Sequence, residues 1–199
     1  MGNDNSNDYD RNEKIRDLEQ KKKNLDDVWD DPFLDVEECF HADMASLHMT
    51  KRIERLKEMN QKDEKFSKIN LDDYRNSDGS FDVYKVKRPL DNPSGNGSYE
   101  SSSKLFHQGV GFGKEGKIIF SDYGTNKENS DIRFWDNSEE KDNWREIEKV
   151  GTSHASNKEI KDIFFGKNSE QWVDHENYSP FFHNCKDYTK EKIKELTEK

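Results

Sequence analysis

The chain has 199 residues and a mass of 23.5 kDa, enough for one domain with an appendage but too short for two full domains. Only 29% of its residues are hydrophobic and 38% are charged, although 12 Phe, 7 Tyr and 4 Trp can supply a small aromatic core. The net charge of −10, without a cluster of basic residues, argues against nucleic acid as a partner.

Cysteine content and hydropathy indicate a cytoplasmic protein. Two cysteines, Cys39 and Cys185, cannot form a disulfide framework, and the chain opens with no secretory signal. No apolar run approaches the ~20 residues needed to span a bilayer. The opening "MGNDNS" fits the pattern for N-myristoylation at Gly2, which would allow weak membrane association. A single acyl chain binds weakly, and the acidic residues that follow it oppose binding to an anionic membrane surface.

The N-terminal part of the sequence divides into a tail and a helical extension. Residues 1–30 form an acidic tail, mobile over 1–12, in which 13–23 favour a short peripheral helix that can bury only Ile15 and Leu18. The extension, residues 31–79, opens with Asp31 as N-cap and Pro32 at the first helical position. Its helix, over 32–59, carries an apolar stripe that we expect to pack on the C-terminal domain or on a partner helix: Val36, Phe40, Met44, Leu47, Leu56 and Met59.

Residues 80–199 have the pattern of an α+β domain. "NSDGS" predicts a turn before the strand "FDVYKVK", and "KLFHQGVGF" and "KIIFSDY" predict a hairpin that turns tightly between Gly113 and Gly116. A further strand is expected over 145–152. Ser156 and Glu159 have the spacing of a capping box for a helix that ends at Gly166. The fold class expected is a small antiparallel sheet packed with a cysteine-bearing helix, preceded by a helical extension.

That helix begins within "YSPFFHNCKDYTKEKIKEL", where Asn184 can cap a helix running to about residue 198. The lysines and glutamates of this tail are expected on solvated faces. Cys185 would lie at the first turn, where unpaired backbone N–H groups and the helix dipole stabilise a thiolate. A buried, unreactive cysteine is the alternative, because free cysteine is among the most often buried residue types.

A nucleophilic thiol needs a base, and histidine is the usual one. His107 is the strongest candidate because it lies in a strand-like run whose neighbouring glycines allow close approach of a substrate. His183 precedes the helix and is expected to point away from Cys185, whereas His154 and His175 lie in polar, turn-like surroundings.

The segments "LFHQGVGFGKEGKIIFSD" and "YSPFFHNCKDYTKEKIKEL" together resemble the circularly permuted papain-like proteins of the NlpC-related superfamily. That group includes the lecithin:retinol acyltransferase (LRAT) type and the PPPDE-type deubiquitinase-like proteases, in which the histidine strand precedes the cysteine helix. His107 and Gly109 match the first motif, and Tyr178, Asn184 and Cys185 match the second. The resemblance covers residues 80–199 and implies a permuted papain-like domain, with Gly109, Tyr178 and Asn184 shaping the site.

The sequence departs from the LRAT pattern at Phe120, where that type has a second histidine. Asp122, two residues further along the expected strand and on the same face, is our candidate for the group that orients His107. The alternative is that "SDYG" forms a turn and that Asp122 opens it.

The resemblance implies a thiol-dependent hydrolase or acyltransferase that cleaves an ester, thioester or amide through an acyl group on Cys185, with His107 as base and no cofactor. Its substrate would be a lipid acyl group, as in the LRAT type, or a peptide or isopeptide, as in the PPPDE type. The alternative is a catalytically inactive protein whose helix over 32–59 binds a protein partner. Cys39, His41 and His48 lack the paired spacing of a zinc site, so no metal is expected.

Overall fold

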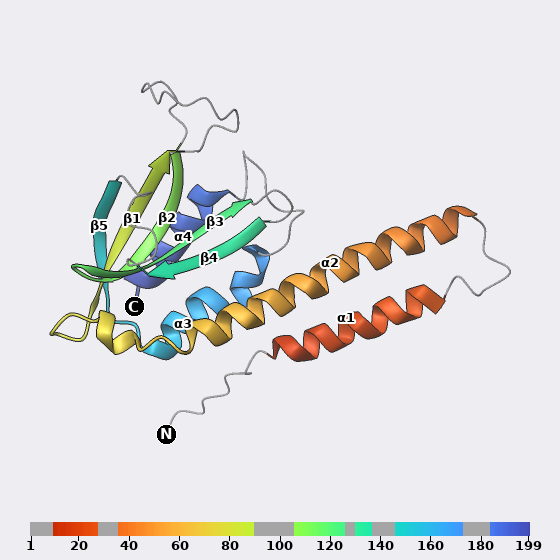
Figure 1. Ribbon diagram of the computed structural model, residues 1–199, viewed down its shortest axis with the longest axis horizontal. Coiled ribbons are helices and arrows are strands. Elements are labelled where there is room, and N and C mark those ends of the chain that lie inside the picture. The colour runs from red at the N-terminus through yellow and green to blue at the C-terminus, as the bar shows by residue number, and fades with distance from the viewer. Residues whose placement is uncertain (1–9, 28–35, 90–105, 126–129, 137–145, 173–183) are drawn as a thin grey trace. The chain divides into compact units, whose positions relative to one another are not determined.

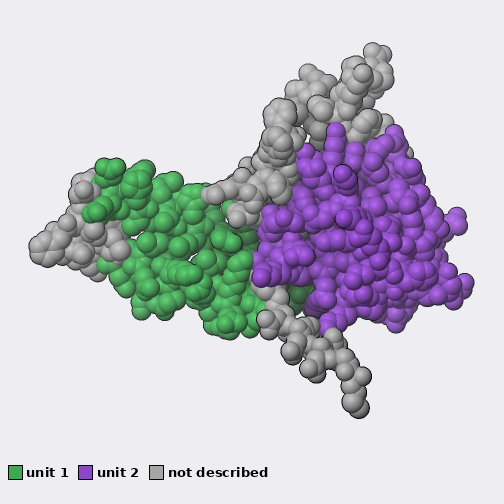
Figure 2. Space-filling view, turned by 180° about the vertical axis from the view of Figure 1, so that it is seen from behind, with its two compact units in different colours: residues 1–68 green, residues 69–199 purple. Residues whose placement is uncertain are grey.

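The computed structural model describes residues 10–27, 36–89, 106–125, 130–136, 146–172 and 184–199 (Figure 1). The chain divides into two compact units, residues 1–68 and residues 69–199 (Figure 2). The unit that contains the sheet therefore begins ahead of residue 80, where the sequence had suggested a boundary, because the turn and short helix before the first strand belong to it. Gly2, Asp31 and Pro32 lie outside the described residues.

The first unit contains two long helices, α1 (Arg11–Asp26) and α2 (Val36–Phe66). Asp10 caps α1, since its side chain accepts a hydrogen bond from the backbone N–H of Asn12 at 2.9 Å. Helix α1 extends beyond the expected range of 13–23 at both ends, and α2, expected over 32–59, continues to Phe66. Polar groups along their exposed faces, including an ion pair of 2.7 Å between Lys21 and Asp17, are typical of solvated helices.

The two helices pair in antiparallel directions through a small apolar cluster. Ile15 and Leu18 of α1 are buried together with Ile53 and Leu56 of α2. Hydrogen bonds flank the cluster, from Asn60 to Asn12 at one end and from Ser46 to Asp26 at the other. Helix α1, which the sequence predicted only as a short peripheral helix, is therefore the packing partner of α2.

The apolar stripe predicted on the second helix is only partly covered. Leu56 and Met59 are buried, but Phe40, Met44 and Leu47 have exposed fractions of 61%, 41% and 47%. These three residues are therefore not packed within the described part of the chain, and their packing on a partner helix stays a prediction. For Phe40 and Met44 the physical reason is length, because α1 ends at Asp26, opposite Ser46, and does not extend along the part of α2 that precedes Ser46.

The second unit is built on a five-stranded antiparallel sheet with the strand order β4-β3-β2-β1-β5. Its strands are β1 (Phe81–Pro89), β2 (Phe106–Lys114), β3 (Lys117–Thr125), β4 (Ser130–Asp136) and β5 (Glu146–Ser153). The α+β class and the small antiparallel sheet are confirmed. Strand β4 was not predicted, although Ile132 and Phe134 alternate with polar residues in the sequence.

Glycines shape the hairpin between β2 and β3 at the expected position. Gly116 has a φ of 81°, in the left-handed region that favours glycine. Gly113 has a φ of 153°, and a Cβ atom there would lie 2.3 Å from the backbone oxygen of Lys117. Any larger residue at Gly113 would therefore force the two strands apart at the turn.

The remaining elements are the short helices η2 (Leu71–Tyr74) and η3 (Lys167–Trp172) and the helices α3 (Asn157–Phe165) and α4 (Cys185–Thr197). The capping box predicted at Ser156 and Glu159 is present, and Gly166 is the C-cap. In Figure 1, α4 lies behind the sheet, and it packs on β2 and β3.

The core between the sheet and its helices is aromatic, as the composition suggested. Phe112 of β2 stacks on Phe164 of α3 with ring centroids 5.2 Å apart. Tyr123 of β3, Trp172 of η3 and Tyr188 of α4 form a second group with centroid distances of 5.2 to 5.9 Å. Large rings contribute a large buried area per residue, which compensates for the low hydrophobic fraction of the chain.

Within the described residues, no helix combines the length and the apolar character needed to cross a membrane.

Candidate active site

Cys185 is the first residue of α4, and a reciprocal cap holds the turn around it. The Asn184 side chain accepts hydrogen bonds from the backbone N–H groups of Lys186 at 2.9 Å and Asp187 at 3.4 Å. The Asp187 carboxylate in turn accepts from the Asn184 backbone N–H at 3.3 Å. The predicted N-cap is confirmed, and the capping box with Asp187 was not foreseen. A thiol therefore lies at the positive end of the helix dipole.

His107 and Asp122 lie on neighbouring strands, and their side chains make contact next to Gly109. In the register of β2 and β3, Asp122 pairs with Gly109, so His107 lies diagonally across from it. The Nε2 atom of His107 lies 2.5 Å from an Asp122 carboxylate oxygen. Because Gly109 shares a face with His107 by strand alternation and carries no side chain, nothing from that position stands between the two groups. Asp122 has no exposed surface and His107 is buried.

The thiol of Cys185 completes a three-residue chain of contacts. It is hydrogen-bonded to the His107 side chain and to the backbone N–H of Gln108. Since Nε2 of His107 is bonded to Asp122, the other ring nitrogen, Nδ1, is the one available to the thiol. The structure thus brings together Cys185, His107 and Asp122, the three residues predicted from the sequence as nucleophile, base and orienting group.

The electrostatic interactions among these three residues favour transfer of the thiol proton to the imidazole. Burial by itself would lower the pKa of His107, but hydrogen bonds and charge interactions with Asp122 and Cys185 outweigh it, and the pKa is raised. Burial by itself would raise the pKa of Cys185, but the hydrogen bonds from His107 and the Gln108 N–H outweigh it, and the pKa is lowered. The two shifts together favour a thiolate beside an imidazolium.

Two alternatives about this strand are resolved by the structure. The interpretation of "SDYG" as a turn is wrong, because Ser121 to Gly124 continue β3. Phe120, in the position where a second histidine was considered, is 2% exposed and packs with Tyr84, Val86 and Ile118. The orienting contact to His107 comes from Asp122, two residues further along the strand.

The other candidate residues lie elsewhere or outside the described part of the chain. His154 is exposed, and Tyr178, His175 and His183 fall outside the described residues. Cys39 lies on α2, half-buried, in the other unit. Within the described residues, no group of three or more His, Cys, Asp and Glu side chains has an arrangement that could hold a metal ion.

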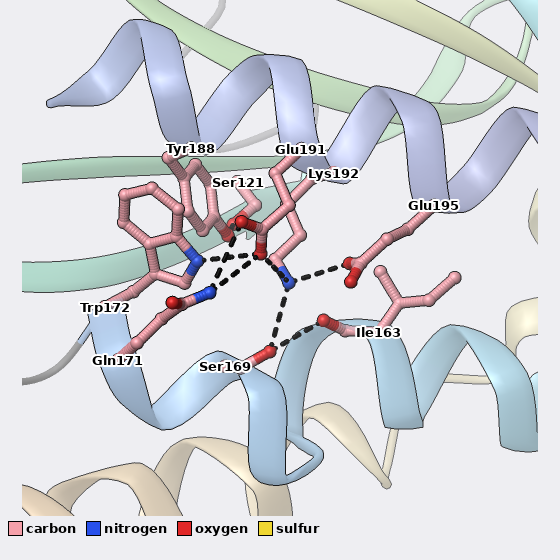
Figure 3. A network of polar contacts seen from close by, with 9 residues as sticks. All are labelled: Ser121, Ile163, Ser169, Gln171, Trp172, Tyr188, Glu191, Lys192 and Glu195. Carbon is pink, nitrogen blue, oxygen red and sulfur yellow. Dashed lines mark hydrogen bonds and ion pairs between the residues drawn. The ribbon is translucent and has the colours of Figure 1, made fainter. Parts of the chain in front are cut away.

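A polar network on the buried side of α4 was missed in the sequence (Figure 3). Lys192 has no exposed surface, and its ammonium contacts Ser169 of η3 at 3.2 Å, Glu191 at 3.3 Å and Glu195 at 2.8 Å. Trp172 donates its indole N–H to Glu191 at 2.9 Å. The expectation that the lysines of this tail are all solvated is therefore wrong for Lys192. The physical reason is its spacing, since it lies seven residues after Cys185 on the buried side of the helix.

A second contact ties α4 to the sheet. The hydroxyls of Tyr188 and Ser121 lie 2.6 Å apart, and neither residue has exposed surface. The helical spacing of Tyr188 from Cys185 could have placed it on the buried face, but no sequence signal pairs it with Ser121. Together these contacts fix the helix that carries the thiol against η3 and β3.

The chain matches no family model, no curated protein and no solved structure. A thiol at a helix start, hydrogen-bonded to an imidazole that is itself bonded to a buried carboxylate, is an arrangement that can activate the thiol as a nucleophile.

Proposed function

We propose that this protein is a thiol-dependent hydrolase or acyltransferase that cleaves an ester, thioester or amide through an acyl group carried on Cys185. The observation that carries the proposal is the hydrogen-bonded series of Cys185, His107 and Asp122 from three different elements. An unreactive packed cysteine needs neither an imidazole partner nor a carboxylate behind it. Burying Asp122 and His107 costs desolvation free energy, and activation of the thiol gives a functional reason for that cost.

The reaction follows from the roles of the three groups. The Cys185 thiolate attacks the carbonyl carbon, forming a carbon–sulfur bond and a tetrahedral oxyanion. The imidazolium of His107 gives its proton to the leaving alcohol, thiol or amine as the bond to that group breaks, and a thioester remains on Cys185. Water or an acceptor alcohol or amine then attacks the thioester, His107 accepts its proton, and the thiolate leaves.

Two further groups assist this chemistry. The backbone N–H of Cys185 lies in the first turn of α4, where such groups have no intrahelical partner and can donate to the oxyanion. Asp122 holds the imidazole in the orientation that presents Nδ1 to the thiol and stabilises its protonated form. These roles make Asp122 an orienting residue and leave bond making to Cys185 and His107.

The fold proposed for residues 80–199 is the permuted papain-like one. Support comes from the order in the chain, since the strand pair with His107 precedes the helix with Cys185, and from the antiparallel sheet against which that helix packs. The resemblance to the LRAT and PPPDE types suggests two substrate classes, acyl lipids and peptides or isopeptides. Acylation of Gly2, with weak membrane association, belongs to the lipid form of the proposal.

The rival proposal is a catalytically inactive protein that binds a protein partner through the N-terminal helix. It requires Cys185 to behave as an ordinary thiol. The hydrogen bonds from His107 and the Gln108 N–H favour the catalytic proposal, because both stabilise the thiolate over the thiol.

The test is acyl transfer to the protein from two activated thioesters, one with a fatty acyl chain and one with a peptide acyl group. Intact-mass spectrometry should show the mass of one acyl group on the wild type and on Cys39→Ala, but not on Cys185→Ala. His107→Ala should slow acylation, whereas His154→Ala, which removes an exposed histidine, should not. The acyl group that transfers faster identifies the substrate class. Equal acylation of the wild type and Cys185→Ala would overturn the proposal.

A further inference from the structure

The three residues of the candidate site belong to three elements, and side-chain contacts join each pair of those elements. Cys185 of α4 bonds to His107 of β2, and His107 bonds to Asp122 of β3. The third pair of elements, α4 and β3, is joined by the hydroxyls of Tyr188 and Ser121, 2.6 Å apart. This third contact involves no group that takes part in the proposed chemistry.

The positions of Tyr188 and Ser121 along their elements are specific. Tyr188 lies three residues after Cys185 and therefore near it on the surface of the helix. Ser121 is the residue directly before Asp122 on β3. In Figure 3, Tyr188 extends from α4 toward Ser121 on the strand beneath. The contact therefore fixes the first turn of the helix relative to the strand position that carries the orienting carboxylate.

The surroundings leave the Tyr188 hydroxyl little freedom. Its ring lies 5.3 Å from the Trp172 ring and 5.9 Å from the Tyr123 ring, and the residue has no exposed surface. Burial raises the pKa of Tyr188 well above its ordinary value, so the phenol stays protonated. A buried neutral hydroxyl must find a partner, and Ser121 provides one.

We propose that the hydrogen bond between Tyr188 and Ser121 is a positioning contact for the candidate site. It holds the first turn of α4 in a fixed position relative to β3, so that Cys185 reaches His107 on the neighbouring strand β2. Tyr188 and Ser121 are positioning residues, not catalytic ones. The inference rests on the proposed role of Cys185 as a nucleophile. Its physical basis is that a hydrogen bond weakens steeply with displacement, so a small shift of the helix lowers the stabilisation that His107 gives to the thiolate.

The test compares Tyr188→Phe, Ser121→Ala and the double variant, all in a Cys39→Ala background. The rate of alkylation by iodoacetamide is measured against pH to obtain the pKa of the Cys185 thiol. Each variant should raise that pKa by about one unit, which moves the midpoint of the alkylation profile about one pH unit higher. Tyr84→Phe is the matched control, since it removes another buried hydroxyl, bonded to Asp82 at 3.3 Å, and should leave the thiol pKa unchanged.

The double variant separates positioning from stability. Each single variant leaves one buried hydroxyl without its partner and lowers the melting temperature, whereas the double variant removes both hydroxyls and should recover most of that loss. A recovered melting temperature with a raised thiol pKa supports the inference. A double variant with the wild-type alkylation profile overturns it, and Ser121→Ala decides the question if Tyr188→Phe does not fold. An ordinary thiol pKa in the wild type would instead overturn the proposed function.

Discussion

Nε2 of His107 lies 2.5 Å from the Asp122 carboxylate, although the two residues are not paired in the register of β2 and β3. The contact is diagonal, and Gly109 stands opposite Asp122 without a side chain. A strand pair therefore supplies both the proposed base and the carboxylate bonded to it, and the start of α4 supplies the thiol.

Replacing Asp122 by Asn should keep a hydrogen-bonding oxygen near His107 but remove the charge that helps to raise the pKa of His107. The high-pH limb of the acylation profile should move to lower pH, and acylation at pH 7 should fall about tenfold or more. Stopped-flow measurement with the activated thioester checks both effects. Asp82→Asn removes another buried carboxylate of the same sheet and should leave the position of that limb unchanged.

The pH dependence of acylation should be bell-shaped. The Cys185 pKa is lowered, so the low-pH limb, where the thiolate is lost, should lie below the ordinary range for cysteine. The His107 pKa is raised, so the high-pH limb, where the imidazolium is lost, should lie above the ordinary range for histidine. Cys185→Ala retains Cys39 and provides the background rate at each pH. A rate that only rises through pH 8 to 9 would contradict the ion pair.

The capping box at the start of α4 should contribute to stability and to thiol reactivity. Asn184→Ala removes the acceptor for two backbone N–H groups and should lower the free energy of unfolding by about 1 kcal/mol, measured by urea denaturation. It should also slow alkylation of Cys185, because the first turn that presents the thiol frays. Asn184→Asp retains a capping oxygen and serves as the control. Equal stability of all three proteins would contradict the cap.

Lys192 should contribute more to the free energy of unfolding than the exposed lysines of the same helix. Lys192→Met keeps the length of the side chain but leaves Glu191 and Glu195, which are partly exposed, without the shared ammonium. We expect the free energy of unfolding to fall by roughly 1–3 kcal/mol, since water can solvate the two carboxylates in part. Lys190→Met, on an exposed position, should change it by less than about 0.5 kcal/mol. Similar effects of the two variants would show that the buried network contributes little.

Local sequence signals were sufficient where neighbours in the chain make the structure. Capping at Ser156 and Asn184 depends on side chains bonding to backbone groups two or three residues away, so the helix starts were predicted. The hairpin at Gly116 depends on a backbone conformation that glycine favours. Strand β4 was missed because its flanking Asn and Asp residues masked a short alternation of apolar residues.

The sequence by itself determined the candidate residues of the site, because a cysteine after an N-cap and a histidine among glycines in a strand each have a local pattern. Only the tertiary structure decided that Asp122 bonds to His107, that Lys192 is buried and that Tyr188 contacts Ser121. The reason is that these contacts join residues brought together by strand register and by the packing of α4 on the sheet. Both depend on the whole core and have no signature within a short stretch of chain.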